Sequence, residues 1–144
     1  MSGSERPRSV TIISWILIVM SLMGFYNCWN SYGMIQSGEY DRIMAENPKL
    51  AAAMKDLPRP TANHILIVAV ALVVQFIAAV LMLQGLGVGR FIYIGSVAIG
   101  FVYTVATMGF HVLLVPSLVV TGIIAFFLFK EPANSYFSGR NAGY

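Results

Sequence analysis

The distribution of apolar and charged residues divides the chain into long apolar tracts and short polar segments. Three tracts contain no Asp, Glu, Lys or Arg: residues 9–38, 61–89 and 91–129. A helix needs about 20 apolar residues to cross a hydrocarbon core of about 30 Å, so the first two tracts each provide one span. The third would be about 60 Å long as a single helix. We therefore expect it to fold back as two shorter spans.

The fold-back is predicted at Gly109, Phe110 and His111, because glycine commonly follows the end of a helix. Pro116 then falls in the first turns of the fourth helix, where its missing N–H group matters little. The pattern predicts an all-α integral membrane bundle of four transmembrane helices, in a single domain over residues 1–144. The predicted spans are 10–32, 64–87, 91–108 and 112–129, with an outer loop over 33–63 and a tail over 130–144.

The outer loop is predicted to form two short amphipathic helices, an extracytoplasmic helical hairpin. Asn47 followed by Pro48 is typical of a helix N-cap and first position, and Pro58 and Pro60 would end the second helix. Such a hairpin either caps the bundle or docks an extracytoplasmic partner. Its apolar residues recur at helical spacing in two stripes: Tyr40, Ile43 and Met44, then Leu50, Met54 and Leu57.

Composition agrees with a membrane protein. Apolar residue types make up 58% of the chain and charged types 10%, whereas soluble domains contain about 25% charged residues. These values exclude a soluble globular enzyme and a disordered chain. Residues 2–8 are similar to the positive start of a secretory signal peptide, but the apolar run that follows is too long and lacks an Ala-x-Ala site. We therefore expect the first helix to be retained.

Lysine and arginine positions predict the orientation. Four spans place both termini on one side, which holds five of these residues against four in the outer loop. Arg6 and Arg8 flank the first span, and Arg90 is the only charge in the turn between the second and third spans. Because Lys and Arg in short segments favour the cytoplasmic side, we expect both termini in the cytoplasm.

Each predicted span carries small or polar residues along one side, as helices that pack against one another in lipid do. Helix packing is the plain interpretation, and a path for an ion or solute is the alternative. Gln75 lies near the middle of the second span. The residues that belong to this packing face or path are Gln75, Ser96, Gly100, Thr104, Ser117 and Thr121.

One possible metal site emerges from the predicted topology. Cys28, His64 and His111 all fall near the outer membrane face. A thiolate with two imidazoles suits zinc or copper, and two histidines on different helices can ligate haem. Against this, the three residues have no ligand-spacing motif, and His and Cys are ordinary residues at such positions. We therefore expect no cofactor and keep this site as a hypothesis.

Little other chemistry is available to the chain. The interiors of the predicted spans contain no acidic or basic side chain, although a proton-coupled carrier usually needs an ionisable group there. Small multidrug-resistance transporters are similar in having four short spans, but their first span carries a glutamate, and residues 12–23 here contain no acid. The serines have no acid or base partner nearby in sequence. Scattered basic residues and a net charge of +3 give no support for nucleic-acid binding.

The two ends of the chain have generic membrane-entry and membrane-exit patterns. The start, Arg-Pro-Arg-Ser-Val-Thr-Ile-Ile-Ser-Trp, and the end, Lys-Glu-Pro-x-x-x-Tyr-Phe, resemble those of many small four-span bacterial inner-membrane proteins. That resemblance implies a bacterial cytoplasmic membrane and no particular activity. In the tail we expect a short turn from Pro132 to Gly139, with Tyr136 and Phe137 as anchors at the membrane interface.

Together, these features predict a small non-enzymatic protein that acts as an accessory or structural subunit of a membrane protein complex. Its surroundings would be the lipid bilayer and other membrane subunits or a second copy of itself. The alternative is a subunit of an oligomeric channel or small-solute transporter.

Overall fold

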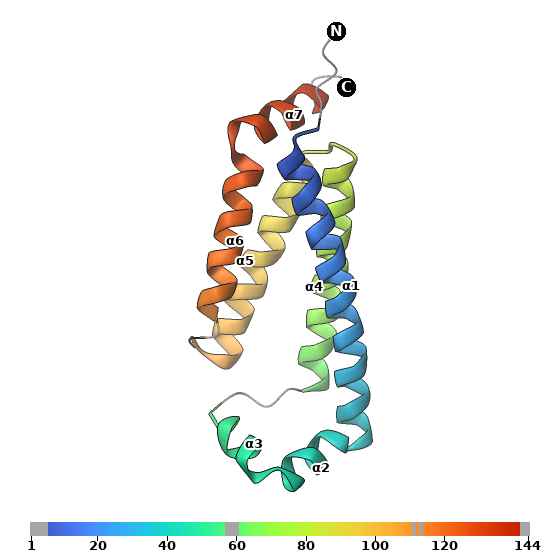
Figure 1. Ribbon diagram of the computed structural model, residues 1–144, viewed down its shortest axis with the longest axis vertical. Coiled ribbons are helices and arrows are strands. Elements are labelled where there is room, and N and C mark those ends of the chain that lie inside the picture. The colour runs from blue at the N-terminus through green and yellow to red at the C-terminus, as the bar shows by residue number, and fades with distance from the viewer. Residues whose placement is uncertain (1–5, 57–60, 111, 113, 142–144) are drawn as a thin grey trace.

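A computed structural model of the chain describes residues 6–56, 61–110, 112 and 114–141, without the side chains of 108 and 139–141. Within these residues the chain forms helices and no strand, which confirms the all-α prediction (Figure 1). The helices are α1 (Arg8–Ser37), α2 (Glu39–Glu46), α3 (Pro48–Ala53), α4 (Ala62–Leu83), α5 (Val88–Met108), α6 (Leu114–Phe129) and α7 (Glu131–Asn141).

Three of these helices, α1, α4 and α5, are long and apolar enough to cross a membrane. Helix α6 has 16 residues, about 24 Å at 1.5 Å per residue, and meets α7 at a bend of 56°. The described chain therefore has three candidate spans, or four if the bent pair α6–α7 is one span. Either number is compatible with a multi-pass membrane protein.

The helix ends follow the glycine positions closely. Helix α5 ends at Met108, and Gly109 takes a φ of 73°, as predicted for the fold-back. Helix α4 ends at Leu83, four residues before the predicted limit of 87, because Gly85 adopts a φ of 82° and turns the chain toward α5. Helix α1 instead continues to Ser37, five residues beyond the predicted limit of 32.

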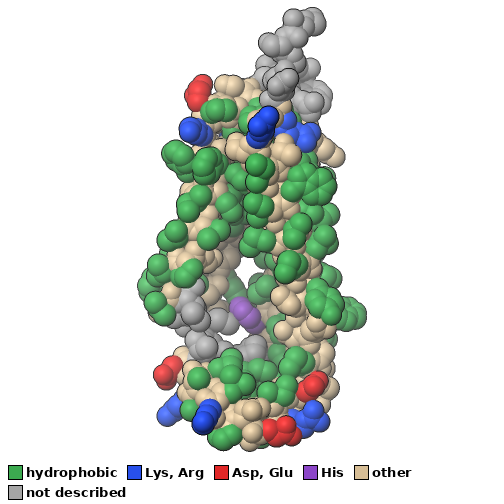
Figure 2. All heavy atoms as spheres, viewed as in Figure 1, with side chains coloured by type: hydrophobic (Ala, Val, Ile, Leu, Met, Phe, Trp, Pro, Cys, Tyr) green, Lys and Arg blue, Asp and Glu red, His purple; other side chains and the backbone are tan. Residues whose placement is uncertain are grey.

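The helices pack tightly at one end of the molecule and loosely at the other. Helices α1 and α4 lie side by side and α4 packs against α5, whereas contacts between α5 and α6 are sparse. We call the end where α1 begins and α7 lies the terminal end, and the end with α2 and α3 the loop end (Figure 1). Between α1–α4 and α5–α6 the space widens toward the loop end, and Figure 2 shows the molecule hollowed there.

The buried core belongs mainly to the terminal end. It combines the first half of α1, the end of α4, the start of α5, the end of α6, and α7. Its residues are Val10, Ile13, Leu17, Ile18, Ala78, Ala79, Met82, Tyr93, Leu128, Ala133, Tyr136 and Phe137.

Helix α7 corrects the prediction for the tail. It is an 11-residue helix that continues through Gly139, and Tyr136 and Phe137 are almost completely buried. They are therefore core residues and not anchors at a membrane interface. The physical reason is the bend of 56° after α6, which lays α7 across the terminal end near the start of α1 (Figure 1). Tyr136 and Phe137 thereby join the same buried cluster as Val10.

Charged side chains lie in two bands, one at each end, and apolar side chains cover the surface between them (Figure 2). Large side chains are exposed along the middle of the helices, for example Trp29 at 75% and Ile99 at 73%. Exposed apolar side chains bounded by two charged bands are typical of helices that face lipid.

Candidate functional site

A buried arginine organises the terminal end. Arg90 lies in the first turn of α5 and is only 9% exposed. Its guanidinium carbon lies 5.1 Å from the ring centre of Phe91, 4.8 Å from that of Phe129 and 5.1 Å from that of Phe137. Its Nη1 donates hydrogen bonds to the Leu128 carbonyl at 3.3 Å and to the Asn134 side chain. Arg90 therefore joins α5, α6 and α7.

From the sequence, Arg90 was identified only as the one charge in the tight turn between the second and third spans. In the structure its positive charge lies over the faces of three aromatic rings, a geometry that stabilises a cation. Within the described residues, no ion pair joins it to a carboxylate. Asn134 also donates from Nδ2 to the Phe129 carbonyl at 2.8 Å, which fixes the junction between α6 and α7.

A cleft lined by both polar and apolar side chains lies between the helix pairs α1–α4 and α5–α6, about midway along α4 and α6. We call it the polar cleft. Its volume is about 380 Å³. Among the described residues that line it, Gln75, Tyr93, Ser117 and Thr121 are polar and none is charged. The apolar lining residues are Leu17, Met20, Val97, Pro116, Val120 and Ile124.

Hydrogen bonds in this cleft leave two polar groups available. Gln75 Nε2 donates to Ser21 Oγ at 3.1 Å, and Ser21 donates to the Leu17 carbonyl at 2.6 Å. A side-chain hydrogen bond also joins Tyr93 and Thr121. Within the described part of the chain, Gln75 Oε1 and the Ser117 hydroxyl have no hydrogen-bond partner.

The cleft collects three of the six residues predicted to form a packing face or path: Gln75, Ser117 and Thr121. Ser96 and Gly100 instead line a separate, apolar groove between α4 and α5 of about 470 Å³. Ser96 donates to the Tyr93 carbonyl and Thr104 to the Gly100 carbonyl, each at 2.8 Å. These hydroxyl groups are satisfied within their own helix.

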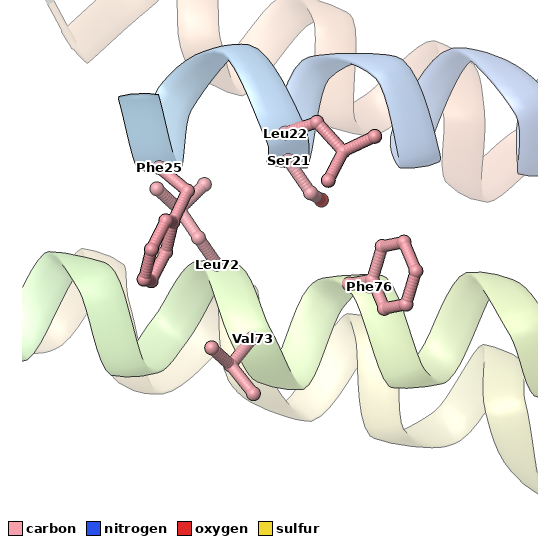
Figure 3. Close-up of a pocket in the computed structure, with 6 residues that line it drawn as sticks. All are labelled: Ser21, Leu22, Phe25, Leu72, Val73 and Phe76. Atoms are coloured by element: carbon pink, nitrogen blue, oxygen red, sulfur yellow. The ribbon is translucent and has the colours of Figure 1, made fainter. Parts of the chain in front are cut away.

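Near the middle of the α1–α4 pair lies a shallower groove of about 230 Å³ (Figure 3). Ser21 is its only polar lining residue, and the others are Leu22, Phe25, Leu72, Val73 and Phe76. A Cβ atom at Gly24 would lie 3.0 Å from Leu72 Cδ1, so the glycine allows α1 and α4 to approach closely. We interpret this groove as part of the contact between α1 and α4.

Two of the three proposed metal ligands, Cys28 and His64, have different surroundings. Cys28 lines an apolar groove with Ile65 and Leu66. His64 stacks on Tyr103 of α5, with ring centres 5.9 Å apart. The described residues contain no group of three His, Cys, Asp or Glu side chains placed to hold a metal. His111 lies outside the described residues, so the three-residue hypothesis stays a prediction.

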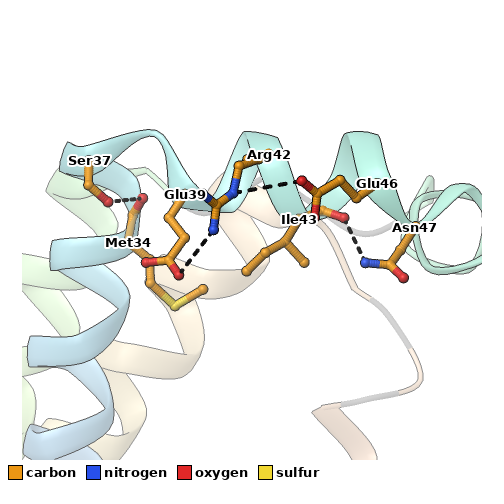
Figure 4. Close-up of polar contacts among 7 residues, drawn as sticks. All are labelled: Met34, Ser37, Glu39, Arg42, Ile43, Glu46 and Asn47. Atoms are coloured by element: carbon orange, nitrogen blue, oxygen red, sulfur yellow. Dashed lines mark hydrogen bonds and ion pairs between the residues drawn. The ribbon is translucent and has the colours of Figure 1, made fainter.

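At the loop end, α2 and α3 confirm two short helices within residues 33–63, and Pro48 is the first residue of α3. Asn47 occupies the N-cap position of α3, as predicted, although its side chain makes no cap hydrogen bond there. Instead Nδ2 donates to the Ile43 carbonyl at 3.1 Å and closes the end of α2 (Figure 4). Arg42 lies 3.9 Å from both Glu39 and Glu46 on the exposed face of α2.

The predicted docking residues are only partly covered. None of the residues of α2 or α3 is buried. Tyr40, Ile43, Met44 and Met54 are half-buried and Leu50 is exposed. Helix α2 packs against α1 and α3. Leu57 lies outside the described residues.

The fold and these sites define an all-helical chain, compatible with a multi-pass membrane protein, that has a closed terminal end and an open polar cleft. Comparisons with protein-family models, with curated proteins and with solved structures found no match.

Proposed function

We propose that the chain is a small non-enzymatic subunit of a bacterial inner-membrane protein complex. In this proposal it has four spans, both termini lie in the cytoplasm, and α2 and α3 form an outer hairpin that docks a partner protein. The partner contacts the apolar stripe of α2 and α3.

The observation that carries this proposal is the incomplete packing of the loop end. The apolar residues Ile43 and Met44 remain half-exposed, while the opposite face of α2 holds Arg42 between two glutamates. An amphipathic helix stabilises itself by covering its apolar face. Among the described helices, α2 makes its main contacts with α1 and α3, and in this proposal a partner subunit supplies the missing cover.

Charge supports the proposed orientation. Arg6, Arg8 and Lys130 lie at the terminal end, where positive side chains favour the cytoplasmic side. At the loop end, acidic and basic residues nearly balance, as in the Glu39–Arg42–Glu46 group. Because Arg90 is buried, only the exposed charges bear on the orientation.

Purification of the full chain in mild detergent tests the proposal. A different membrane protein should co-purify with it in a fixed ratio. The double substitution Ile43→Ser and Met44→Ser should reduce the co-purified partner about fivefold or more, because a serine pair removes the apolar contact. Ala45→Ser, at an exposed position in the same helix, is the matched control. A monodisperse parent protein without a partner contradicts the proposal.

The polar cleft favours a second candidate, a subunit of an oligomeric channel or small-solute carrier. Three residues of the predicted path meet there, and no charged side chain lines it. Uncharged solutes are therefore its expected cargo. In liposomes, the parent protein should carry glycerol and Gln75→Leu should slow the flux. Equal glycerol flux in liposomes with and without protein contradicts this candidate.

A further inference from the structure

We propose that the cleft between α1–α4 and α5–α6 binds an uncharged amphiphile that carries hydroxyl groups and a single apolar chain, such as a monoacylglycerol. This inference goes beyond the proposed function and does not depend on a partner protein. It rests on what the cleft offers and on what it leaves unsatisfied.

The size and lining of the cleft match a small-molecule site. Its volume of about 380 Å³ lies within the roughly 300–1,000 Å³ of ligand pockets, which are mostly apolar with a few placed polar groups. The cleft opens to the surface at Ser117 and Val120, which are exposed on α6. A chain that lies in the surrounding lipid can therefore enter from the side.

The polar groups define the head of the ligand. Gln75 Oε1 accepts hydrogen bonds and the Ser117 hydroxyl can donate one, and neither has a partner within the described residues. Both groups line the cleft, so a ligand that enters it can form hydrogen bonds with them. A head with hydroxyl groups supplies both a donor and an acceptor. Because no charged side chain lines the cleft, the head is uncharged.

The apolar residues define the tail. Met20 of α1, Val97 of α5 and Val120 with Ile124 of α6 form the walls. Methionine and branched aliphatic side chains suit a flexible hydrocarbon chain, because they offer dispersion contacts without polar demands. A compact, fully polar solute would leave these walls uncovered.

Photolabelling of the full chain in phosphatidylcholine nanodiscs tests this site. The probe is a monoacylglycerol with a diazirine in its acyl chain, and the labelled peptides are identified by mass spectrometry. Labels should concentrate on cleft residues such as Val97 and Val120. Unlabelled monooleoylglycerol should compete about eightfold better than methyl oleate, the factor expected for two hydrogen bonds in a bilayer.

Two neighbouring valines provide a matched pair of variants. Val120 lines the cleft, whereas Val119 does not and is 56% exposed. Val120→Trp should reduce labelling of the cleft about fivefold or more, and Val119→Trp should change it less than twofold. Ser117→Ala adds no bulk and should reduce the preference for monooleoylglycerol over methyl oleate about threefold. Size-exclusion profiles of the variants check their folding.

Equal labelling of Val119→Trp and Val120→Trp would overturn the proposal, as would labels spread evenly over lipid-facing positions of α1. Equal competition by monooleoylglycerol and methyl oleate would overturn the assignment of the head. A photocrosslinker placed at Ser117 that captures a protein helix in native membranes, with no lipid adduct, would show a partner segment in the cleft instead.

Discussion

The two ends of the molecule place an arginine in opposite environments. At the terminal end, Arg90 is buried among three aromatic rings and bonded to α6 and α7. At the loop end, Arg42 lies between two glutamates on an exposed surface, at 3.9 Å from each. The first arrangement joins the three helices α5, α6 and α7, whereas the second joins residues of one short helix on its exposed face. The contacts that link different helices through an arginine therefore lie at the terminal end.

The largest effect is expected from Arg90→Ala. The substitution leaves the Leu128 carbonyl and the Asn134 side chain without their donor and opens a cavity among the rings. Such a loss should lower the free energy of unfolding by about 2–4 kcal/mol, measured by denaturant titration in detergent. Arg8→Ala, at an exposed position of the same end, should change it by less than about 0.5 kcal/mol. Equal effects would show that Arg90 does not organise this end.

A glycine pair in α5 tests the closeness of packing. A Cβ atom at Gly89 would lie 2.7 Å from the Ala78 carbonyl oxygen and 2.9 Å from the Met82 nitrogen, whereas nothing lies within 4 Å at Gly95. Gly89→Ala should therefore lower the free energy of unfolding by about 1–3 kcal/mol. Gly95→Ala should leave it unchanged or raise it by up to about 1 kcal/mol. A destabilised Gly95→Ala with a tolerated Gly89→Ala contradicts the α4–α5 contact.

The hydrogen bond at the border between the two ends should have a smaller effect. Gln75→Leu and Ser21→Ala each remove the bond between Gln75 Nε2 and Ser21 Oγ. A double-mutant cycle should give a coupling energy of about 0.6–1.7 kcal/mol, as for other hydrogen bonds between membrane helices. Additive effects of the two substitutions would mean that the bond does not stabilise the α1–α4 pair.

The smallest effect is expected at the loop end. Arg42→Ala breaks two exposed ion pairs, which contribute about 0–1 kcal/mol in total. We expect a change in the free energy of unfolding below about 0.5 kcal/mol, and a still smaller change at high salt. A loss as large as that of Arg90→Ala would show that the loop end, too, holds the fold together.

Periodicity and breaker residues were enough to predict the all-α fold, the fold-back at Gly109 and the start of α3 at Pro48. These features depend on local physics, because an uncharged apolar run favours helix and glycine permits a positive φ. The extra length of α1 was not predicted. The helix continues through Gly33 to Ser37 and ends where Gly38 adopts a φ of 73°.

The terminal end could not be predicted because it depends on contacts distant in sequence. Arg90 meets Phe129 and Phe137 only after α6 returns and α7 bends by 56°. One feature of the sequence did indicate a special role for Arg90, because it is the only charged residue between residues 60 and 129. We placed Tyr136 and Phe137 at a membrane interface because aromatic residues are common there. Their burial in the core instead results from the bend between α6 and α7, which the sequence pattern does not reveal.

For the cleft, the sequence identified Gln75, Ser117 and Thr121 but not their separation from Ser96 and Gly100. Helical spacing says which residues share a face of one helix, and it does not say which faces meet. Tyr93 entered the site unexpectedly, because its hydroxyl reaches Thr121 across the α5–α6 gap.

Photocrosslinking in native membranes tests the central claim, that the loop end is open to a partner. The crosslinker benzoylphenylalanine is placed at Ile43, on the apolar stripe, or at Ala45, at an exposed position of α2. We expect a protein adduct of defined mass at position 43 and at least about fivefold less of it at position 45. Lipid adducts alone at position 43, or equal protein adducts at both positions, would contradict it.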